Sequence, residues 1–576
     1  MELEGTVEVP QNTGKITLKK QGKVTYVEYT YAREYKEKKK YNIPKRKTIG
    51  KLCADDPSRM HPNQNFAVFF PDVELPEDDR GPVRSNCLKI GSYAVIRKII
   101  EDYGLNEIMS QIIGKGSGLF LDIAAYTIIT ENNAAQYYPD YAFNHPLMTE
   151  GMKVYSDSVV GEFMKNISID QRIRFLNQWN AKRDHREKIY ISYDSTNKAV
   201  EAGDIDEAEP GHAKDEKSYP IINYSIAYDR TNRVPLFYED YPGSVIDITQ
   251  LQCMLEKAKS LGYSRCGFIL DRGYFSKSNI RYMDKNGYDF IMMVKGQKKR
   301  VHALINEYRG KFEDVRQNSI RQFRVYGTTI PHKLYADDEK DRYFHLYYSS
   351  YRHAEEQEDI EDRIEKEKKL LKKAFGKTKE MDSCYDHYFT PIYYHEGQED
   401  QTLQEVQEKS GVIEEEIRYC GYFCIITSKK MSAKDALTIY KSRDESEKLF
   451  REDKTFLDNA TLGVQKQNVA DAKIFIEFVA LVIRNKIYTS LVDEAKNEDI
   501  KANYMNVPAA LKELEKIEMT RMGNGEYALD HAVTKTQKKI LKAFGMDAVS
   551  IQKEAARIGK VLEDKDGKNE EAGIAG

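Results

Sequence analysis

Hydrophobic and polar residues alternate along residues 14 to 51, beginning with "KITLKKQGKVTYVEYTYAREY". A period of two in a segment rich in Thr, Tyr and Val predicts a small β-sheet. Further on, "GSYAVIRKIIEDYGLNEIMSQII" and "GLFLDIAAYTIITENNAAQYY" carry apolar residues at the helical period of 3.6. Residues 85–183 are therefore predicted to form a helical module, either a plain bundle or a helix-turn-helix unit.

The pattern changes at "KIYISYDST", where alternating apolar residues lead into Asp194. Two more strands are predicted in "IINYSIAYD" and "RVPLFYEDYPG", followed by a helix in "ITQLQCMLEKAKSLG". The next segment, "RCGFILDRGYFSKSNIRYM", indicates a buried strand that ends at Asp271 and a helix capped by Ser276 or Ser278. This order predicts an α/β fold, in which groups beyond the strand ends can meet in one crevice.

A highly charged segment, "YKSRDESEKLFREDK", is predicted to be a helix that begins at Tyr440. With about 100° of rotation per residue, Tyr440, Arg443, Glu447 and Lys454 fall within an arc of about 60°. Charged helical faces usually point to water. A face that combines a tyrosine, two cations and an acid also fits a binding site, so the helix alone leaves both interpretations open.

Composition places the chain among soluble globular proteins of several domains, because it has 576 residues, of which 40% are apolar and 31% charged. The net charge of −3 does not by itself indicate a nucleic-acid binder. The charge is unevenly distributed, however. Lys15 to Lys51 contains 13 Lys or Arg and 3 Glu, a local net charge of 13 − 3 = +10. Basic charge is concentrated in the N-terminal arm.

Several classes of protein are disfavoured. The seven cysteines form no C-x-x-C pair, which argues against a disulfide framework or a zinc knuckle. No glycine loop for nucleotides and no nucleophile elbow is present. The start "MELEGTVEVP" lacks the pattern of a signal peptide, and the apolar run "IFIEFVALVI" is interrupted by Glu477 and too short to span a bilayer. We expect a cytoplasmic protein with no membrane partner.

Three acids stand out as candidates for chemistry. Asp194 and Asp271 lie at predicted strand ends, and Glu447 lies on the charged helix that follows the strand "GYFCIITS". An Asp after a strand often only caps a turn. Carboxylates that approach one another repel, however, unless a divalent cation lies between them. Ligation by oxygen alone favours Mg²⁺ or Mn²⁺, and two such ions can support in-line attack of water or a 3′-hydroxyl on a phosphodiester.

This combination resembles the DDE transposases of bacterial insertion sequences, in the branch whose acidic helix carries Y-x-x-R-x-x-x-E-x-x-x-x-x-x-K. Tyr440, Arg443, Glu447 and Lys454 supply every element of that signature. The segments "YDST" and "DRGYFSKSNI" are similar to the first and second acid motifs of the family, and "YPGSVID" is similar to the segment between them. The resemblance extends from "KTIGKL" through "HLYYSSYRHAEEQEDIEDRIEKEKKLL" and covers most of the chain.

The resemblance implies an α/β fold with a ribonuclease-H-like catalytic core and a β-rich insertion, preceded by a small basic β segment and a helical module. The long interval of 447 − 271 = 176 residues between the second and third acids leaves room for that insertion. The predicted parts are, in order, a basic β-rich DNA-binding arm (1–60), a helical DNA-binding or dimerisation module (85–183), the first part of the core (184–296), the β-rich insertion with a charged helix (297–417), the second part of the core (418–495), C-terminal helices (496–562) and a disordered tail (563–576).

The resemblance also implies a role for each candidate residue. Asp194, Asp271 and Glu447 would be the catalytic acids and would bind two Mg²⁺ ions, for which Mn²⁺ can substitute. Arg443 and Lys454 would orient phosphates near the scissile bond. The remaining DNA contacts would come from Tyr440, toward the terminal nucleotides, and from Arg272, which either contacts phosphate or pairs with a neighbouring carboxylate.

The implied reaction is cut-and-paste transposition: metal-dependent cleavage at the ends of an insertion sequence, then strand transfer into target DNA. The implied partner is double-stranded DNA, both transposon ends and target, bound by a homodimer in the cytoplasm at the nucleoid. In the branch that this chain resembles, an aromatic residue of the insertion can stack on a flipped base during hairpin formation. Here the sole tryptophan, Trp179, precedes the first acid, so a Tyr or Phe would have to take that role.

Two other functions stay open on the sequence alone. A metal-dependent DNA nuclease of the same fold would cut without joining. A catalytically silent DNA-binding derivative would do neither, although the intact set of three acids argues against it.

Overall fold

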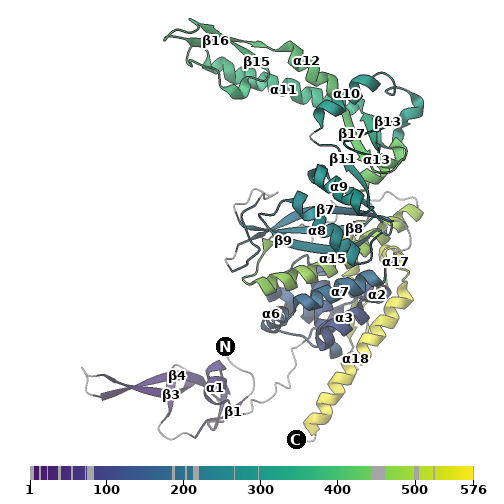
Figure 1. The fold of residues 1–576 in the computed structure, drawn as a ribbon. Helices are drawn as coiled ribbons and strands as arrows, with labels where there is room; N and C mark the ends of the chain where they lie inside the picture. Colours follow the sequence, from purple (N-terminus) through teal and green to yellow (C-terminus); the bar gives the residue numbers. More distant parts are fainter. Residues whose placement is uncertain are drawn as a thin grey trace. The chain divides into compact units, whose positions relative to one another are not determined.

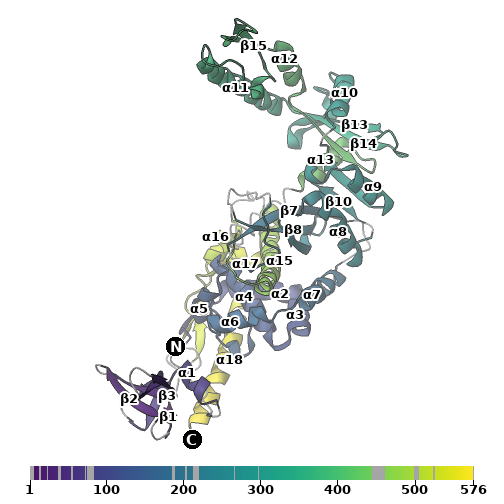
Figure 2. The same ribbon diagram turned by 60° about the vertical axis from the view of Figure 1, so that its left-hand side comes forward.

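The computed structural model describes residues 6–11, 15–21, 24–36, 41–53, 56–71, 73, 84–183, 189–201, 204–211, 219–264, 266–295, 297–443, 461–498, 505–522 and 526–574. The chain forms two compact units, which are described separately (Figure 1, Figure 2). The first unit comprises Met1–Asn86, Gly151–Tyr155 and Ile558–Gly576. The second comprises Cys87–Glu150 and Ser156–Arg557 and contains the α/β core.

The first unit is built on an antiparallel sheet with the strand order β1-β5-β4-β3-β2. Its strands are β1 (Val7–Glu8), β2 (Ile16–Gln21), β3 (Val24–Lys36), β4 (Tyr41–Leu52) and β5 (Arg59–Pro62). The short helix α1 (Gln64–Phe69) covers one face, and Val27, Ile49, Met60 and Phe66 form the buried core beneath it. The alternating pattern of the sequence places these apolar residues on one side of the sheet.

The second unit begins with a strand and a series of helices. These are β6 (Cys87–Lys89), α2 (Gly91–Asp102), α3 (Leu105–Ile113), η1 (Gly114–Gly116), α4 (Ser117–Thr130), η2 (Ala135–Tyr137), α5 (Tyr138–Asn144), α6 (Asp157–Lys165) and α7 (Ile169–Ala181). The helix α7 starts at a capping box formed by Ser168 and Gln171. The indole of Trp179, near its end, is fully buried and donates a hydrogen bond to the carbonyl of Pro235 (3.0 Å).

One helical segment of the described chain, Leu105–Thr130, is long and apolar enough to cross a membrane by length and composition, with a mean hydropathy of 1.4. A single segment of this kind is weak support for a membrane role, because core helices pass the same test. Here 61% of it is buried inside the protein. Phe120 of α4 packs against Phe475, with ring centroids 4.8 Å apart.

The core of the second unit is a mixed sheet in which β7, β9, β10 and β11 run in the same direction, while β8, between β7 and β9, is antiparallel to both. Five neighbouring strands have the order β11-β10-β7-β8-β9. The elements are β7 (Tyr190–Val200), β8 (Ile221–Asp229), β9 (Val234–Pro242), α8 (Asp247–Ser260), β10 (Gly267–Leu270), η4 (Arg272–Tyr274), α9 (Lys277–Lys285) and β11 (Asp289–Met293). This is the arrangement of a ribonuclease-H-like core, and it confirms the fold class expected from the sequence.

The same sheet continues beyond β11, with the order β11-β17-β14-β13-β12. The additional elements are α10 (Lys298–Tyr308), η5 (Arg316–Asn318), β12 (Ser319–Ile320), η6 (Arg321–Phe323), β13 (Val325–His332), β14 (Arg342–Tyr348), β17 (Tyr422–Thr427) and α13 (Ala433–Lys441). Near the end of β7, beyond the residues paired with β10, β18 (Thr461–Leu462) pairs in parallel with β7. Strands of the segment 297–417 therefore extend the core sheet itself.

The remainder of that segment forms a separate layer around its own small core. Its elements are α11 (Ser350–Ala374), η7 (Ser383–Tyr385), the hairpin of β15 (Phe389–Tyr394) and β16 (Thr402–Glu408), and α12 (Ser410–Tyr419). Ile364 and Leu371 of α11 are buried against Phe389 and Leu403 of the hairpin. The segment predicted as one β-rich insertion is thus divided between the core sheet and this helix-and-hairpin layer.

The long helix α15 (Gln467–Asn497) packs against β9 and against the helices α4 and α6. Figure 1 shows it between β9 and α6. Phe478 packs on Tyr238 of β9, with centroids 4.8 Å apart. The elements after α15 are three helices, α16 (Val507–Leu514), α17 (Lys535–Lys542) and α18 (Ala548–Ile574), and two strands, β19 (Glu518–Arg521) and β20 (Tyr527–Leu529).

The backbone of α18 is helical through Ile574, whereas the sequence predicts a disordered tail from residue 563. Continuing an existing helix needs no new nucleation, so polar residues can extend it.

Candidate active site

The parallel pairing of β7 and β10 brings two of the predicted acids to neighbouring positions. Tyr193 of β7 pairs with Leu270 of β10, and the next residues along the two strands are Asp194 and Asp271. Neighbouring strands lie about 4.8 Å apart, so the two carboxylates start from adjacent backbone positions. Both residues are half-buried.

The sequence predicts that Asp194 lies at the end of a strand. In the structure it lies within β7, which continues to Val200. β7 continues to Val200 because its other edge is paired with β8, where Asp194 faces Ile226. Its pairing with β10 stops at Tyr193, and pairing with β18 resumes only at Ala199. The site therefore opens in the gap between these two partner strands.

Asp271 does not cap the turn that follows it, since its side chain makes no hydrogen bond to the backbone of η4. Its carboxylate instead forms an ion pair with Arg443, whose Nη1 lies 2.9 Å from Oδ1. The Arg443 guanidinium is 16% exposed and the Asp271 carboxylate 35% exposed. The structure thus places one predicted DNA-contacting residue directly beside the second predicted acid.

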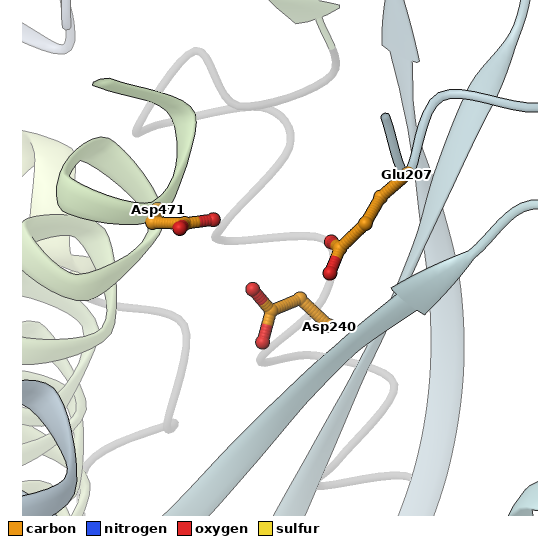
Figure 3. A group of neighbouring side chains, drawn as sticks. All are labelled: Glu207, Asp240 and Asp471. Atoms are coloured by element: carbon orange, nitrogen blue, oxygen red, sulfur yellow. The ribbon is translucent and has the colours of Figure 1, made fainter. Parts of the chain in front are cut away.

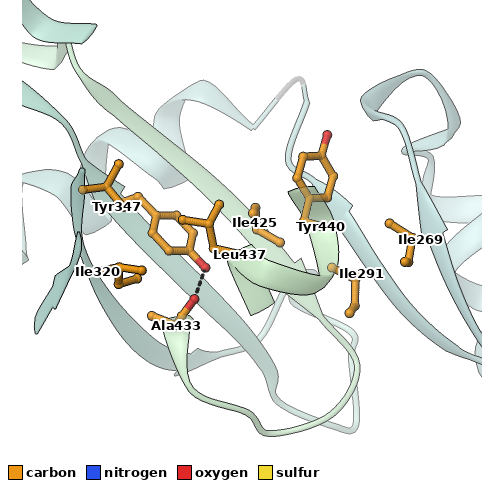
Figure 4. Packing of buried hydrophobic residues seen from close by; sticks show 9 residues of the cluster. Ile269, Ile291, Ile320, Tyr347, Ile425, Ala433, Leu437 and Tyr440 are labelled. Carbon is orange, nitrogen blue, oxygen red and sulfur yellow. Dashed lines mark hydrogen bonds between the residues drawn. The ribbon is translucent and has the colours of Figure 1, made fainter. Parts of the chain in front are cut away.

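The position of Arg443 depends on the packing of α13 against the extended sheet. Leu437 and Tyr440 of α13 are buried in a cluster with Ile291 and Ile425 (Figure 4). At the start of the helix, the buried hydroxyl of Tyr347 donates a hydrogen bond to the carbonyl of Ala433 (2.8 Å). Strands contributed by the insertion therefore anchor the helix that leads to Arg443.

The helix that carries Tyr440, α13, ends earlier than the sequence predicts. α13 stops at Lys441, and the amide of Arg443 donates to the carbonyl of Tyr440 (3.1 Å), which closes a tight final turn. The Ser442 hydroxyl donates to the Ile439 carbonyl (2.6 Å), a local bond that competes with helix continuation. The expectation of one unbroken helical stripe from Tyr440 is therefore wrong for Arg443, which reaches Asp271 from a turn.

Tyr440 is 6% exposed, and Figure 4 shows its hydroxyl directed away from the apolar cluster. It lines a cavity of about 360 Å³ together with Lys441, Arg352, Phe323 and Phe423. The guanidinium of Arg352 lies over the ring of Phe423, 5.3 Å from its centroid. Sequence periodicity gave no indication of this cavity, because its residues come from five separate segments.

The other predicted residues divide into two groups. Arg272 is exposed in η4, and no ion pair of its side chain is found in the part of the chain that the structure describes. Glu447 and Lys454 lie outside the described residues.

A second acidic group, which sequence analysis did not predict, lies where α15 packs on β9. Carboxylate oxygens of Glu207, Asp240 and Asp471 lie within 4.8 Å of one another and could hold a metal ion (Figure 3). Arg172 of α7 already contacts both oxygens of Asp240, at 2.8 and 2.7 Å. The guanidinium supplies a positive charge to this acidic group. No sequence signal marks the group, because its members are widely separated and share no motif.

Burial raises the pKa values of two acids of this group, Glu207 and Asp471. Desolvation, reinforced by the neighbouring charges of Asp240 and Asp471, raises the pKa of Glu207 from 4.5 to about 7. Desolvation also raises the pKa of Asp471, although the amide of Gln467 donates a hydrogen bond to its carboxylate (2.8 Å). Glu207 is therefore protonated over part of the pH range in which an exposed glutamate is ionised.

Comparison with known proteins identifies the family. A family model described as "Transposase DDE domain" matches residues 186–483, which is more than half of the chain. The protein belongs to this family, which confirms the resemblance stated above. The matched range spans Asp194, Asp271 and Glu447 and continues into α15.

Solved structures give weaker likenesses. One is a cryo-EM structure of the piggyBac transposase synaptic complex with hairpin DNA, with 8% identity and a TM-score of 0.31 over 63% of this chain and 59% of that chain. Another is the Mos1 transposase paired-end complex with the left transposon end, with 12% identity and a TM-score of 0.14 over 23% and 50%. Both alignments span less than two thirds of the other chain, and both TM-scores are below 0.5. No curated protein matches the chain.

The raised pKa of Glu207 predicts a pH-dependent stability. Its folded-state pKa of about 7 exceeds its ordinary value of 4.5, so the folded state binds the proton more tightly. The resulting stabilisation is present below pH 4.5 and is lost as the pH rises through about 7. A Glu207→Gln variant, which mimics the protonated acid, should therefore gain thermal stability relative to wild type between pH 5 and pH 8.

The measurement is the unfolding temperature of both proteins across this pH range, with the exposed Glu201→Gln as the matched control. A constant difference between Glu207→Gln and wild type at all pH values would show that Glu207 titrates normally.

Proposed function

We propose that this protein is a DNA transposase that cleaves the ends of an insertion sequence and transfers them into target DNA, by a cut-and-paste mechanism that requires divalent metal. The observation that carries the proposal is the adjacent placement of Asp194 and Asp271, with Arg443 on Asp271, inside a domain of the transposase DDE family. Such a protein would act in the cytoplasm, at the nucleoid.

The donor set fits Mg²⁺ or Mn²⁺, because Asp194 and Asp271 present carboxylate oxygens from neighbouring strands. Glu447 would complete the set. It lies four residues after Arg443, and four residues of chain span at most about 14 Å. The segment that carries it is held at both ends, by the contact of Arg443 with Asp271 and by the pairing of Thr461 with Ala199 on β7. When bound, two metal ions would activate the attacking hydroxyl and stabilise the leaving oxygen.

The protein's own residues would orient the DNA. Before DNA binds, Arg443 would hold Asp271 in position. Once substrate is present, it would contact a phosphate oxygen, because a guanidinium donates hydrogen bonds to phosphate as well as to carboxylate. Arg272, exposed beside Asp271, would contact the same backbone. The position of Arg443 supports its role in orienting DNA, because the buried helix before it fixes the backbone from which its side chain extends to Asp271.

A hairpin step, if the reaction has one, would need an aromatic residue near the acids. Phe323, which lies in the predicted insertion, lines the cavity beside Tyr440. This residue is the candidate for the role that tryptophan fills in the branch that the chain resembles. Trp179 is fully buried under β9 and takes no part in such contacts.

Two rival functions differ in their products. A nuclease of the same fold would cut DNA ends and never join them to a target. A silent DNA-binding derivative would bind ends and do neither. The intact pair of acids, one in β7 and one directly after β10, argues against the silent derivative. A strand-transfer assay distinguishes the nuclease from the transposase.

The acids are tested by cleavage and joining of a duplex copied from the DNA that flanks the gene, with Mg²⁺ or Mn²⁺. Asp271→Asn and Glu447→Gln should each lower the cleavage rate on the order of a thousandfold, because each removes an interaction worth several kcal/mol in the transition state. Both variants should still bind the duplex without metal.

The matched control is Asp471→Asn, which changes one acid of the second group and should leave cleavage within a few-fold of wild type. If Asp471→Asn abolishes cleavage while Asp271→Asn cuts normally, the active centre lies at the second group and the proposed assignment is wrong.

Arg443 is tested by single-turnover cleavage rates. Arg443→Ala should slow cleavage by about a hundredfold, because it removes a cation from the developing charge at the scissile phosphate. Arg443→Lys should recover part of the loss, since it restores the charge without the bidentate geometry. Arg281→Ala, which removes an exposed ion pair with Asp337, serves as the control and should have little effect.

If Arg443→Lys is as slow as Arg443→Ala, and both unfold at lower temperature than wild type, then Arg443 stabilises the fold and has no direct role in cleavage.

A further inference from the structure

The N-terminal sheet has one covered face and one open face. α1 and the buried residues Val27 and Ile49 occupy the covered side. On the other side, Tyr26 of β3 pairs with Lys51 of β4, and the Lys51 ammonium lies over the Tyr26 ring, 5.9 Å from its centroid. Residues that pair across two strands share a face, so His61, which pairs with Lys51, lies on the open face as well.

Two strands of this sheet continue past the others as a ribbon. β2 pairs with β3 only as far as Tyr29, and β5 pairs with β4 only over Gly50–Leu52. The Thr30 amide still donates to the carbonyl of Lys15 (2.8 Å), and within the described residues the part of β3 from Tyr31 to Lys36 pairs with β4 alone. We call this part, residues 31–36 and 41–46, the ribbon; Figure 1 and Figure 2 show it extending from the sheet. An isolated two-stranded ribbon is marginally stable in water, which favours a partner that packs on it.

The two faces of the ribbon differ in their charge. Arg46 pairs with Thr30 and Arg33 pairs with Pro44, so both arginines project from the same face in diagonal positions. Lys45 projects from the opposite face, where it forms an ion pair of 3.0 Å with Glu34. Both arginines are exposed, and neither makes an ion pair with any residue that the structure describes.

An aromatic ring accompanies the arginines. Tyr35 is 58% exposed and lies two residues from Arg33 along β3, so it shares their face. We call the surface formed by Arg33, Arg46 and Tyr35 the arginine face. It combines two guanidinium groups with an exposed phenol on a narrow, two-stranded support.

We propose that the ribbon enters the major groove of duplex DNA at the ends of the element, with the arginine face toward the base edges. The inference rests on the proposed function, which makes DNA ends the substrate. The major groove is about 12 Å wide and admits a two-stranded ribbon, and guanidinium groups contact guanine edges in bidentate fashion. The lysines of the open sheet face, Lys19 and Lys51, lie along the phosphate backbone.

The shape of the ribbon favours DNA over other anionic partners. Double-stranded RNA has a deep and narrow major groove that side chains cannot read, so a ribbon of this width does not fit it. An acidic protein surface would be attracted by charge alone and would not distinguish the arginine face from the lysines on the opposite face. The two faces therefore provide the test.

The test measures binding of the full chain, without metal, to a duplex copied from the DNA that flanks the gene. The variant Arg33→Ala/Arg46→Ala should raise the dissociation constant by about a hundredfold, because two base contacts are lost. The matched control is Lys45→Ala/Lys47→Ala, which removes the same charge from the opposite face of β4 and should raise the constant by no more than about threefold. An RNA duplex of the same sequence should bind more weakly than DNA.

Equal losses in the two double variants, or no loss in either, would overturn the assignment of the arginine face. Tighter binding of RNA than of DNA would overturn the choice of partner. If the alanine variant fails to fold, Arg33→Lys/Arg46→Lys keeps the charge and should still weaken binding, because the bidentate contacts are lost; unchanged binding in that variant would contradict base recognition.

The inference can fail separately from the proposed function. A chain that binds DNA through the arginine face and never cuts it with metal would overturn the transposase and leave the ribbon's role standing. A chain that cuts and joins DNA while the Arg33→Ala/Arg46→Ala variant binds normally would overturn the ribbon's role alone.

Discussion

The proposed active site depends on the parallel pairing of β7 with β10. Backbone hydrogen bonds fix the register of these strands, and the register fixes the starting positions of Asp194 and Asp271. A shift of one residue would turn one carboxylate to the opposite face of the sheet and separate the acids. The pairing stops after Tyr193 and Leu270, which leaves both acids at an open edge where substrate and metal ions can reach them.

The insertion contributes to this site through the sheet. β14 pairs with β17, which pairs with β11, so strands that are remote in sequence continue the core sheet. α13 packs on these strands and delivers Arg443 to Asp271. An ion pair of two partly exposed groups contributes little to stability. In the proposed reaction the ion pair matters for position, because it places a cation where the charge of a phosphate would develop.

The sequence predicted the core strands and the family, because each leaves a local signal: apolar patterns mark the strands that lead to Asp194 and Asp271, and Tyr440 begins a signature with fixed spacing. The catalytic role of the acids stays a prediction. The contact of Arg443 with Asp271 could not be predicted, since helical periodicity assumes an unbroken helix and α13 ends at Lys441. The joining of β12, β13 and β14 to the core sheet was also missed, because a strand pattern does not specify its partner. The group of Glu207, Asp240 and Asp471 has no local signal at all and arises from the packing of α15 on β9.

The central claim is that Asp194, Asp271 and Glu447 converge on one metal centre. Fe²⁺ occupies oxygen-ligated sites that accept Mg²⁺ or Mn²⁺, and with ascorbate and peroxide it cuts the polypeptide backbone next to the residues that bind it. Mapping these cuts in the DNA-bound protein is the most direct test. The account predicts fragments that end close to residues 194, 271 and 447. Fragments that end close to residues 207, 240 and 471 would contradict it and would place the metal at the second acidic group.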